Sequence, residues 1–399
     1  MFLPPWPRIG EQQKINYNLK DITNFLHLIG NPQNHIPNII HIAGTNGKGS
    51  TLSFLKAILE ANNYKVNAYT SPHLLEFNER IYLGGNNITD AEINSYAKYL
   101  EKKAENLPIT FFEGTTAMAF YAFSKNKADF TLLETGCGGR LDATNVVEKK
   151  LATIITSISF DHMQLLGNTI SKIAYEKACI MRANTHAIIA KQEYKTALKV
   201  LLNYATKINA KPFVYGKDFF STKHKLGLVG KHQVFNASSA LACIENLKED
   251  GFKFSDEKIK QGLENATWPA RMQKVFFQGK EVWLDGCHNR DGAKKLVENL
   301  QGFQEKITIF MSIKQGKEVA EIIKPFSKLS NATIYFCPMD SMDYENLEML
   351  VKIANEYNIK AKKTTDYKKT LNLIDKTEKI VFCGSLYFMA EIISASNTK

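Results

Sequence analysis

The stretch His41–Thr51, HIAGTNGKGST, contains three glycines around a single lysine. It follows the apolar run Ile39–Ala43 and precedes a segment whose apolar residues recur with helical spacing, so it predicts a strand, a glycine-rich loop and a helix. In that arrangement the N–H groups of the loop and the positive end of the helix face an anion. Lys48 would then reach the β- and γ-phosphates of a nucleotide, and Ser50 or Thr51 would support its metal ion.

The glycine spacing of this loop differs from the usual nucleotide-binding pattern, G-x-x-x-x-G-K-[ST]. The segment GTNGKGS is shorter than that pattern, and Gly49 follows the lysine directly. A tight turn between a strand and a helix is the alternative interpretation, but such a turn needs one glycine at most. Because Gly44, Gly47 and Gly49 surround a single lysine, we expect a phosphate-binding loop.

Length and composition are those of an ordinary two-domain globular protein. The chain has 399 residues, of which 44% are hydrophobic and 23% charged, and its net charge is +11. A net positive charge of this size is compatible with nucleic acid, a membrane surface or small polyanions as partners. No stretch approaches the ~18 consecutive apolar residues of a membrane-spanning helix, and the N-terminal MFLPPWPRIG lacks the apolar segment of a signal peptide. The six cysteines form no CxxC pair, so we expect reduced thiols in the cytoplasm rather than zinc ligands or disulfides.

Short apolar strands alternate with helical patterns along the chain, which is typical of a parallel sheet wrapped by helices. The predicted strands of the first series are Ile39–Ala43, Val66–Tyr69, Phe130–Glu134, Thr153–Ile158 and Ala187–Ala190. The predicted helices include Lys48–Ala61, Ala91–Glu105, Thr116–Ser124, Ile170–Arg182 and Asn236–Leu247.

A second series begins near Val282, with predicted strands at Val282–Asp285, Ile307–Met311, Thr333–Cys337 and Ile380–Cys383. Pro269, in NATWPARMQ, breaks any helix just before that series, so we place the domain boundary near Val275. The predicted fold class is therefore α/β, with an N-terminal P-loop-type parallel-sheet ATPase domain at residues 1–275. A smaller C-terminal Rossmann-like α/β domain would occupy residues 276–399.

Two predicted strands lead into side chains that suit a divalent metal ion. Glu134 stands at the end of the strand Phe130–Glu134 in LLETGCGGRLDATN, and Asp161 and His162 follow the strand Thr153–Ile158 in SISFDHM. Ligands of open α/β sheets bind at the carboxyl edge of the strands. A carboxylate and an imidazole at that edge suit a metal next to bound phosphates. The alternative for His162 is a capping or core histidine.

Lys177 interrupts an otherwise apolar helical pattern in IAYEKACIMR. One interpretation is a surface lysine whose alkyl chain lies along the protein while its ammonium reaches water. The other is a lysine in a confined site, which can lose its proton and react with carbon dioxide to become a carbamate.

Ten segments together resemble the folylpolyglutamate synthase/dihydrofolate synthase family of the Mur ligase superfamily, in order and over nearly the whole chain. They are GTNGKGS, TSPHLLEFNERI, FFEGTTA, ETGCGGRLDATN, SFDHMQLLG, IAYEKACI, GKHQVFNASSALA, WPARMQ, LDGCHN and CGSLYF. Among Mur-type ligases, TSPHL…NERI together with GGRLDATN is specific to this family.

The resemblance implies an ATP-dependent ligase that adds L-glutamate to dihydropteroate, to tetrahydrofolate (poly)glutamates, or to both. The reaction would pass through an acyl phosphate and release ADP and phosphate. Whether one or both activities are present stays open. The resemblance also implies Mg²⁺, with two ions expected, and ATP as co-substrate. The partners would be small molecules, with no nucleic acid and no membrane, and the chain would act as a monomer in the cytoplasm.

The resemblance assigns expected roles to individual residues. Catalysis would depend on Lys48, His162 and Lys177, with Lys177 carbamylated. The metal ligands would be Ser71, Glu134 and His162. ATP would be bound by Asn46, Gly47, Lys48, Gly49 and Ser50 and, from the far side of the cleft, by Asn236, Arg271 and Asp285. The pterin pocket would be lined by Thr110, Phe111, Phe112, Glu113, Leu141, Asp142 and Ala143, while His288 and Ser385 would face the incoming glutamate.

Three positions depart from the family pattern, and two rival functions fit parts of the sequence. Cys179 stands where glycine is usual, Cys287 where alanine is usual and Arg290 where proline is usual, which concerns local packing. A peptidoglycan Mur-type ligase would need a further N-terminal UDP-binding domain, but the glycine-rich loop starts only about forty residues into the chain. A nucleic-acid-stimulated P-loop ATPase would use the basic charge, but no basic stripe interleaved with aromatic residues is evident.

Overall fold

The computed structural model describes residues 18–104 and 107–397, and these divide into two units. The first unit runs to Gly227 and also includes Val234–Thr267. The second unit combines the short segment Leu228–Gln233 with the chain from Trp268 onward. Within the described ranges, no helix has both the length and the apolar character needed to cross a membrane.

The described part of the first unit is built on an eight-stranded sheet. Its strands are β1 (Ile39–Ala43), β2 (Val66–Tyr69), β3 (Ile81–Leu83), β4 (Asn86–Asn87), β5 (Phe130–Glu134), β6 (Ala152–Ile155), β7 (His186–Ile189) and β8 (Lys211–Val214). They lie in the order β4-β3-β2-β5-β1-β6-β7-β8, and all pairs are parallel except those of β3. The residues of β1, β2, β5 and β6 are all buried, as expected of strands covered by helices on both faces.

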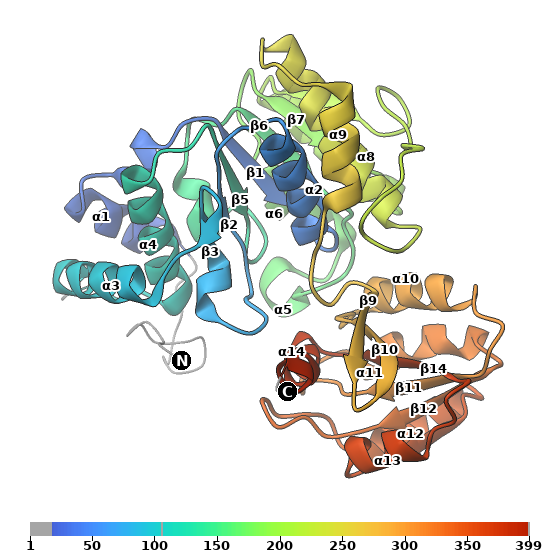
Figure 1. Ribbon diagram of the computed structural model, residues 1–399. Coiled ribbons are helices and arrows are strands. Elements are labelled where there is room, and N and C mark those ends of the chain that lie inside the picture. The colour runs from blue at the N-terminus through green and yellow to red at the C-terminus, as the bar shows by residue number, and fades with distance from the viewer. Residues whose placement is uncertain (1–17, 105–106, 398–399) are drawn as a thin grey trace. The chain divides into compact units, whose positions relative to one another are not determined.

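Helices cover both faces of this sheet. They are α1 (Lys20–Leu28), α2 (Lys48–Ala61), α3 (Asp90–Ala104), α4 (Phe111–Lys125), α5 (Met163–Leu166), α6 (Ile170–Ala178), α7 (Lys195–Lys207), α8 (Gln233–Glu249) and α9 (Asp256–Asn265). Ile39 packs in the apolar cluster of α1, α3 and α4, and Ala43, on the same face of β1, packs in that of α6 and α7. Helix α2 packs against α9, across the sheet from α4 (Figure 1).

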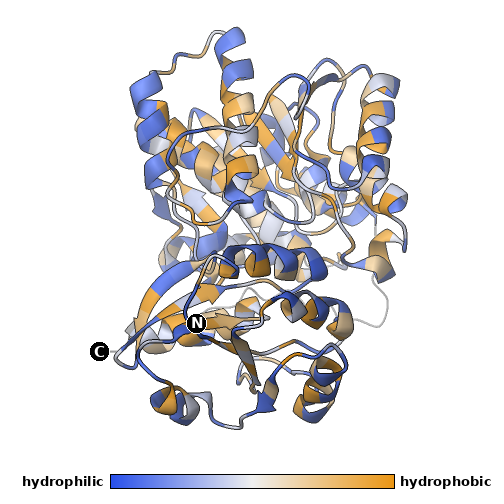
Figure 2. Cartoon of the chain, turned by 90° about the vertical axis from the view of Figure 1, so that its right-hand side faces the viewer, coloured by the Kyte–Doolittle hydropathy of each residue, from blue (hydrophilic) through white to orange (hydrophobic). Residues whose placement is uncertain are grey.

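The described part of the second unit is built on a six-stranded sheet. Its strands are β9 (Gln273–Phe277), β10 (Lys280–Asp285), β11 (Ile307–Met311), β12 (Ala332–Phe336), β13 (Ala361–Lys363) and β14 (Lys379–Cys383). They lie in the order β13-β12-β11-β14-β10-β9, and only the β9–β10 pair is antiparallel. The helices are α10 (Arg290–Leu300), α11 (Val319–Ile323), α12 (Leu347–Glu356), α13 (Tyr367–Leu373) and α14 (Leu386–Asn397). Figure 2 shows hydrophobic and hydrophilic residues on different sides of the helices, as expected where helices cover a sheet.

The predicted domain boundary near Val275 lies inside β9. That strand pairs antiparallel with β10, from Phe277 opposite Lys280 to Gln273 opposite Leu284. Because β9 finds its backbone hydrogen-bond partners on β10, it belongs to the second unit, and the division falls before Trp268.

The predicted bounds of β1, β2, β5, β11 and α2 match the structure. The predicted strand Thr153–Ile158 is too long, since β6 ends at Ile155. Helix α4 begins at Phe111, earlier than predicted, because Thr110 and Glu113 form a capping box at its start. Helix α6 was predicted to reach Arg182 but ends at Ala178, because the carbonyls of the next residues accept hydrogen bonds from side chains.

Candidate active site

The glycine-rich loop joins the carboxyl end of β1 to the start of α2. Gly47 precedes the helix with a left-handed backbone, φ 94°, and no side chain caps the first turn. The loop is held in place by the end of the neighbouring strand, since the N–H groups of Thr45 and Asn46 both donate to the carbonyl of Ser157, at 2.9 and 3.2 Å. A fixed loop that leads into an uncapped helix of 14 residues is an arrangement that binds phosphate groups.

Asn236 lies directly against this loop. A Cβ added at Gly47 would be 2.4 Å from Oδ1 of Asn236, so the loop approaches the amide as closely as only glycine allows. Asn236 is carried by α8 and belongs to the first unit. Asn236 therefore belongs to the same unit as the glycine-rich loop, as the predicted first domain of residues 1–275 implies, and its role in ATP binding stays a prediction.

Lys48 extends from the first residue of α2 toward the edge of the sheet. Its Nζ donates to the carbonyl of Gly44 at 3.2 Å and lies 4.0 Å from Oε1 of Glu134. Glu134 ends β5 and is only 5% exposed, and its other oxygen accepts the N–H of Ser71 at 3.3 Å. The structure thus brings Lys48, Glu134 and Ser71 together at the carboxyl edge of three neighbouring strands.

The surroundings of Glu134 fit a magnesium ion that is shared with bound phosphates. In the described ranges, no group of three or more histidine, cysteine, aspartate or glutamate side chains gathers so that it could hold a metal ion. Mg²⁺ does not need such a group, because it keeps several waters and takes one or two protein carboxylates plus substrate phosphates. A buried carboxylate near an uncapped helix start, with Ser50 buried in the first turn of that helix, meets this requirement.

His162 lies beyond the end of β6, at the start of the short helix α5. Its backbone is left-handed, with φ 49°, and its side chain is 48% exposed. Nε2 lies 4.0 Å from Oδ1 of Asp161, and the same carboxylate oxygen accepts the N–H of His162 at 3.0 Å. The role of His162 as a metal ligand stays a prediction.

Lys177 is not a surface lysine, because it is only 4% exposed. It lies on the last turn of α6, whose first turn is capped by the hydroxyl of Thr169. Its Nζ donates to the carbonyl of Gly44 at 3.0 Å, the oxygen that also accepts from Lys48. Burial, and secondly the positive charge of Lys48, lower the pKa of Lys177 to about 8.

The aromatic residues predicted for the pterin pocket lie at the start of α4. The ring of Phe112 lies against Gly136, where an added Cβ would come within 2.5 Å of the ring. The guanidinium of Arg80 lies 5.4 Å from the centre of the Phe111 ring. Thr110 and Glu113 hold each other, since Oε2 of Glu113 accepts the N–H and the hydroxyl of Thr110, at 2.9 and 2.7 Å. Their polar groups therefore fix the entry to α4.

Asp142, which stands between Leu141 and Ala143, fixes the loop that follows β5. One of its carboxylate oxygens accepts the N–H groups of Gly136 and Cys137, at 2.8 and 2.9 Å, and the other accepts the N–H and the hydroxyl of Thr144. Burial raises the pKa of Asp142, while these hydrogen bonds oppose that shift. Burial also raises the pKa of the Cys137 thiol to about 11, so it is not a thiolate at neutral pH.

The predicted residues of the second unit lie near the carboxyl ends of β10 and β14, which pair side by side. The carboxylate of Asp285 accepts the N–H groups of Met272 and Cys287, at 3.2 and 3.0 Å. Burial raises the pKa of Asp285, and the charge of Arg271 opposes that shift. Ser385 Oγ accepts the N–H of Tyr387 at 3.2 Å, at the start of α14. Nδ1 of His288 lies 2.9 Å from the carbonyl of Gly286.

The sequence did not single out two groups that the structure places in these sites. The carbonyl of Gly44 joins Lys48 to Lys177, but a backbone oxygen leaves no signal in the sequence. Lys314 follows β11, next to β14, and its Nζ lies 5.3 Å from the centre of the Tyr387 ring. Lys314 is the third residue after the buried strand β11, and a lysine so soon after such a strand is the signal that could have pointed to it.

Two family models match the chain. A Mur ligase middle domain matches residues 42–244, and the C-terminal domain of dihydrofolate synthetase matches residues 271–395. The chain is 34% identical over 400 residues to a dihydrofolate synthase/folylpolyglutamate synthase of Bacillus subtilis, and the match covers 91% of each chain.

Solved structures of similar proteins share the fold over almost the full length. A folylpolyglutamate synthase of Mycobacterium tuberculosis complexed with ADP matches with a TM-score of 0.89 at 26% identity, covering 98% of this chain and 97% of that one. A bifunctional folylpolyglutamate synthase/dihydrofolate synthase of Yersinia pestis, complexed with AMPPNP and a manganese ion, matches with a TM-score of 0.85 at 27% identity and covers 99% of each chain.

Proposed function

This chain belongs to the folylpolyglutamate synthase/dihydrofolate synthase family of Mur-type ligases, and we propose that it uses ATP to add L-glutamate to dihydropteroate, to tetrahydrofolate (poly)glutamates, or to both. Similar proteins carry these activities in their names and bind ADP or AMPPNP. The observation that best supports the proposal is the meeting of Lys48 and Lys177 on the carbonyl of Gly44, at the uncapped start of α2.

The first step transfers the γ-phosphoryl group of ATP to a carboxylate. That carboxylate is a weak nucleophile, so the enzyme must align it and neutralise the charge of the phosphates. Lys48 and the first N–H groups of α2 would do this. A carboxylate oxygen attacks the γ-phosphorus, the bond from that phosphorus to the bridging oxygen breaks, and ADP leaves.

The second step forms the amide. The amine of glutamate attacks the carbonyl carbon of the acyl phosphate and loses a proton to water. Phosphate departs with one of the original carboxylate oxygens. The net charge of +11 suits this chemistry, because ATP, glutamate and polyglutamyl tails are all anions.

The metal ligands that we propose are Ser71, Glu134 and His162, with Mg²⁺ as the ion and two ions in the active state. When bound, Mg²⁺ neutralises negative charge on the phosphates. Glu134 is the ligand with the strongest support, because its carboxylate is buried beside Lys48 and next to the N–H of Ser71. The manganese ion in the Yersinia pestis structure is consistent with a divalent metal.

We also propose that carbon dioxide carbamylates Lys177. The lowered pKa of Lys177, about 8, leaves part of the amine unprotonated near neutral pH. The amine nitrogen bonds to the carbon of carbon dioxide and loses a proton, which gives a carbamate anion. This change replaces the repulsion between Lys48 and Lys177 with an attraction, so burial of the modified side chain becomes less costly.

The remaining roles follow the local contacts. Phe111 and Phe112 would present their rings to the pterin, while Thr110, Glu113 and Asp142 would shape the two loops around it, with Leu141 and Ala143 on the second loop. The residues that we propose for ATP are Asn46, Gly47, Gly49, Ser50, Asn236, Arg271 and Asp285. His288, Ser385 and Lys314 would bind the carboxylates of glutamate.

Incorporation of labelled glutamate tests the proposed function. Dihydropteroate and tetrahydrofolate are offered separately with ATP, Mg²⁺ and labelled L-glutamate, and labelled product and phosphate are measured. We expect phosphate release only when both glutamate and a pterin substrate are present. Phosphate release that responds to DNA or RNA but not to these substrates would contradict the proposal. The two pterin substrates also show which of the two activities the chain has.

The compartment and the oligomeric state are part of the proposal. All six cysteines are free thiols, five of them buried, as expected of a protein in the reducing cytoplasm. We propose that the chain acts as a monomer, and light scattering on an active sample checks this directly.

A further inference from the structure

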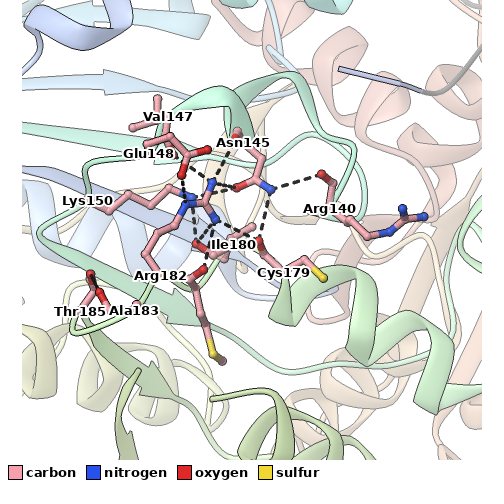
Figure 3. A network of polar contacts seen from close by, with 11 residues as sticks. Arg140, Asn145, Val147, Glu148, Lys150, Cys179, Ile180, Arg182, Ala183 and Thr185 are labelled. Atoms are coloured by element: carbon pink, nitrogen blue, oxygen red, sulfur yellow. Dashed lines mark hydrogen bonds and ion pairs between the residues drawn. The ribbon is translucent and has the colours of Figure 1, made fainter. Parts of the chain in front are cut away.

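Lys150 ties the end of α6 to the loop that carries Asn145 (Figure 3). Lys150 is 9% exposed, and its Nζ donates to the carbonyl of Ile180 and to Oδ1 of Asn145, both at 2.8 Å. The amide nitrogen of Asn145 in turn donates to the carbonyls of Arg140 and Cys179, both at 3.2 Å. Lys150 and Asn145 therefore bridge two backbone segments that are far apart in sequence.

Arg182 makes the same connection with more hydrogen bonds (Figure 3). Nη1 donates to the carbonyls directly after α6, those of Cys179, Ile180 and Met181, at 3.2, 3.4 and 3.1 Å. Nη2 donates to the carbonyl of Asn145 at 3.0 Å, to its Oδ1 at 3.1 Å and to the carbonyl of Val147 at 3.1 Å. Nε pairs with Glu148 at 3.0 Å, but that carboxylate is 79% exposed and contributes little.

Two positive charges thus converge on backbone oxygens, at the negative end of a helix. Burial is the main reason that the pKa of Lys150 lies well below its usual value, and the charge of Arg182 adds to the shift. A glycine would end a helix without such a cost. Burying the charges of Lys150 and Arg182 costs free energy. Their presence therefore indicates a role beyond ending the helix.

The loop of residues 139–150 also contacts α6 just before Lys177, at Glu176. The N–H of Arg140 donates to the carbonyl of Glu176 at 2.7 Å. At Gly139 an added Cβ would lie 2.6 Å from that carbonyl oxygen and 3.2 Å from Cα of Lys177. The N–H of Ile180 donates to the carbonyl of Lys177 itself, at 3.3 Å. The backbone around Lys177 is therefore held from both sides by residues 139–150.

We propose that Arg182, with Lys150 and Asn145, is a positioning residue for the ligation reaction, holding the backbone of Lys177 where its side chain reaches Gly44. The inference rests on the proposed function, since it assigns these residues to the reaction. We call Arg182, Lys150 and Asn145 together the clamp. Leu141, Asp142 and Ala143, proposed for the pterin pocket, belong to the loop of residues 139–150, so the clamp holds this loop and Lys177 in one arrangement.

Hydrogen exchange of the full chain tests the clamp without reference to activity. In Arg182→Met, we expect the amides of residues 177–181 to exchange at least about tenfold faster than in the wild type, because the carbonyls after α6 lose their donors. Helix α9, which does not contact the clamp, should keep its exchange rate. Unchanged exchange at residues 177–181 would overturn the clamp, whatever reaction the protein catalyses.

Steady-state kinetics test the positioning role. We expect Arg182→Met to lower kcat about tenfold or more while KM for ATP stays within about twofold, because the misplaced group is Lys177 and not the nucleotide loop. Arg182→Lys keeps the charge but has fewer donors in a different geometry, so its kcat should fall between those of Arg182→Met and the wild type. The matched control is Ile173→Val, which removes one methylene from a buried residue of the same helix.

The outcomes separate the positioning role from loss of stability. If Ile173→Val and Arg182→Met lower Tm equally and also lower kcat equally, the positioning role is wrong. An Arg182→Lys variant with wild-type kcat would also overturn it. If Arg182→Met does not fold, Lys150→Met, which removes two hydrogen bonds, takes its place with the same expectations. If no pterin substrate is glutamylated by the wild type, the proposed function fails while the exchange result still decides the clamp.

Discussion

The ammonium groups of Lys48 and Lys177 donate to a single oxygen, the carbonyl of Gly44, at 3.2 and 3.0 Å. Lys48 comes from the nucleotide loop itself, whereas Lys177 comes from α6, more than a hundred residues further along the chain. The shared oxygen therefore connects the loop that would bind phosphates to a buried lysine that would otherwise have no part in it. Two cations on one acceptor repel each other, and this repulsion adds to the effect of burial in lowering the pKa of Lys177.

Loss of the Lys48 ammonium should abolish most of the turnover. Lys48→Ala removes the positive charge at the start of α2 that would neutralise the phosphates, so we expect kcat to fall by about two to four orders of magnitude. The rate of phosphate release from ATP, in the presence of glutamate and the pterin substrate, measures this kcat. The control is Lys195→Ala, which removes an exposed lysine from α7. If both variants kept near-normal turnover, the phosphate-binding role of the loop would be wrong.

A methyl group at position 47 should damage the site more than the backbone strain alone explains. Gly47→Ala places an L residue at φ 94° and brings its Cβ within 2.4 Å of Asn236. Gly251→Ala is the matched control, because Gly251 has φ 93° and an added Cβ there meets nothing within 4 Å.

We expect Gly251→Ala to lower stability by about 1 kcal/mol and to keep its activity. Gly47→Ala should lose stability by more than that and should also bind ATP more weakly, since either the loop or Asn236 must move. Unfolding by urea and ATP titration measure the two effects. Equal behaviour of the two variants would show that Asn236 does not confine the loop.

The stability of the protein should depend on pH through Lys177. Its pKa in the folded protein, about 8, is below the ordinary value of 10.5, so between these values the unfolded chain binds more protons than the folded one. The free energy of unfolding therefore rises with pH across this window, and the cost of burying the charged lysine, on the order of 3 kcal/mol, is present below it.

Lys177→Met isolates this effect, because it removes the titrating group and keeps an apolar side chain of similar length. In buffer free of bicarbonate, we expect the stability advantage of Lys177→Met over the wild type to shrink by about 3 kcal/mol between about pH 7 and about pH 10. Urea unfolding of both proteins at each pH measures the difference. An advantage that is the same at both ends of the range would mean that Lys177 keeps its ordinary pKa.

Carbamylation of Lys177 predicts chemical rescue by acids. Lys177→Ala should lose activity, and acetate should restore part of it by supplying an anion in the vacated space. Ethylamine is the matched additive, because it supplies a cation of similar size. Rescue by ethylamine rather than acetate, together with an unmodified mass for the wild type kept in bicarbonate, would rule out the carbamate.

Much of the fold follows from the sequence because burial is complete in the central strands. The strands β1, β2 and β5 are rich in apolar residues and buried throughout, and their predicted bounds are correct. The end of α6 was missed because Ile180 and Met181 continue the apolar period, although their carbonyls are taken by Lys150 and Arg182. Hydrogen bonds from side chains to distant backbone oxygens leave no periodic pattern.

Site residues at the end of a strand could be predicted from the sequence. Contacts between segments that are distant in sequence could not. Glu134 and Lys48 stand directly at the ends of β5 and the glycine-rich loop, and the structure brings them within 4.0 Å. The contact between Asn236 and Gly47 was not predictable, because the two residues are far apart in sequence and their approach depends on the path of the chain. The contact between Lys177 and Gly44 was likewise not predictable, since its acceptor is a backbone atom.

The path of one carboxylate oxygen shows whether the reaction passes through an acyl phosphate. Dihydropteroate or a reduced folate is prepared with isotopically heavy oxygen in the carboxylate that receives glutamate, and the phosphate released in the complete reaction is analysed by mass spectrometry. If ATP phosphorylates that carboxylate, each phosphate molecule carries one heavy oxygen, and none appears when the same substrate is supplied with ordinary oxygen. Phosphate that contains only ordinary oxygen, formed in step with the amide, would contradict an acyl-phosphate ligase.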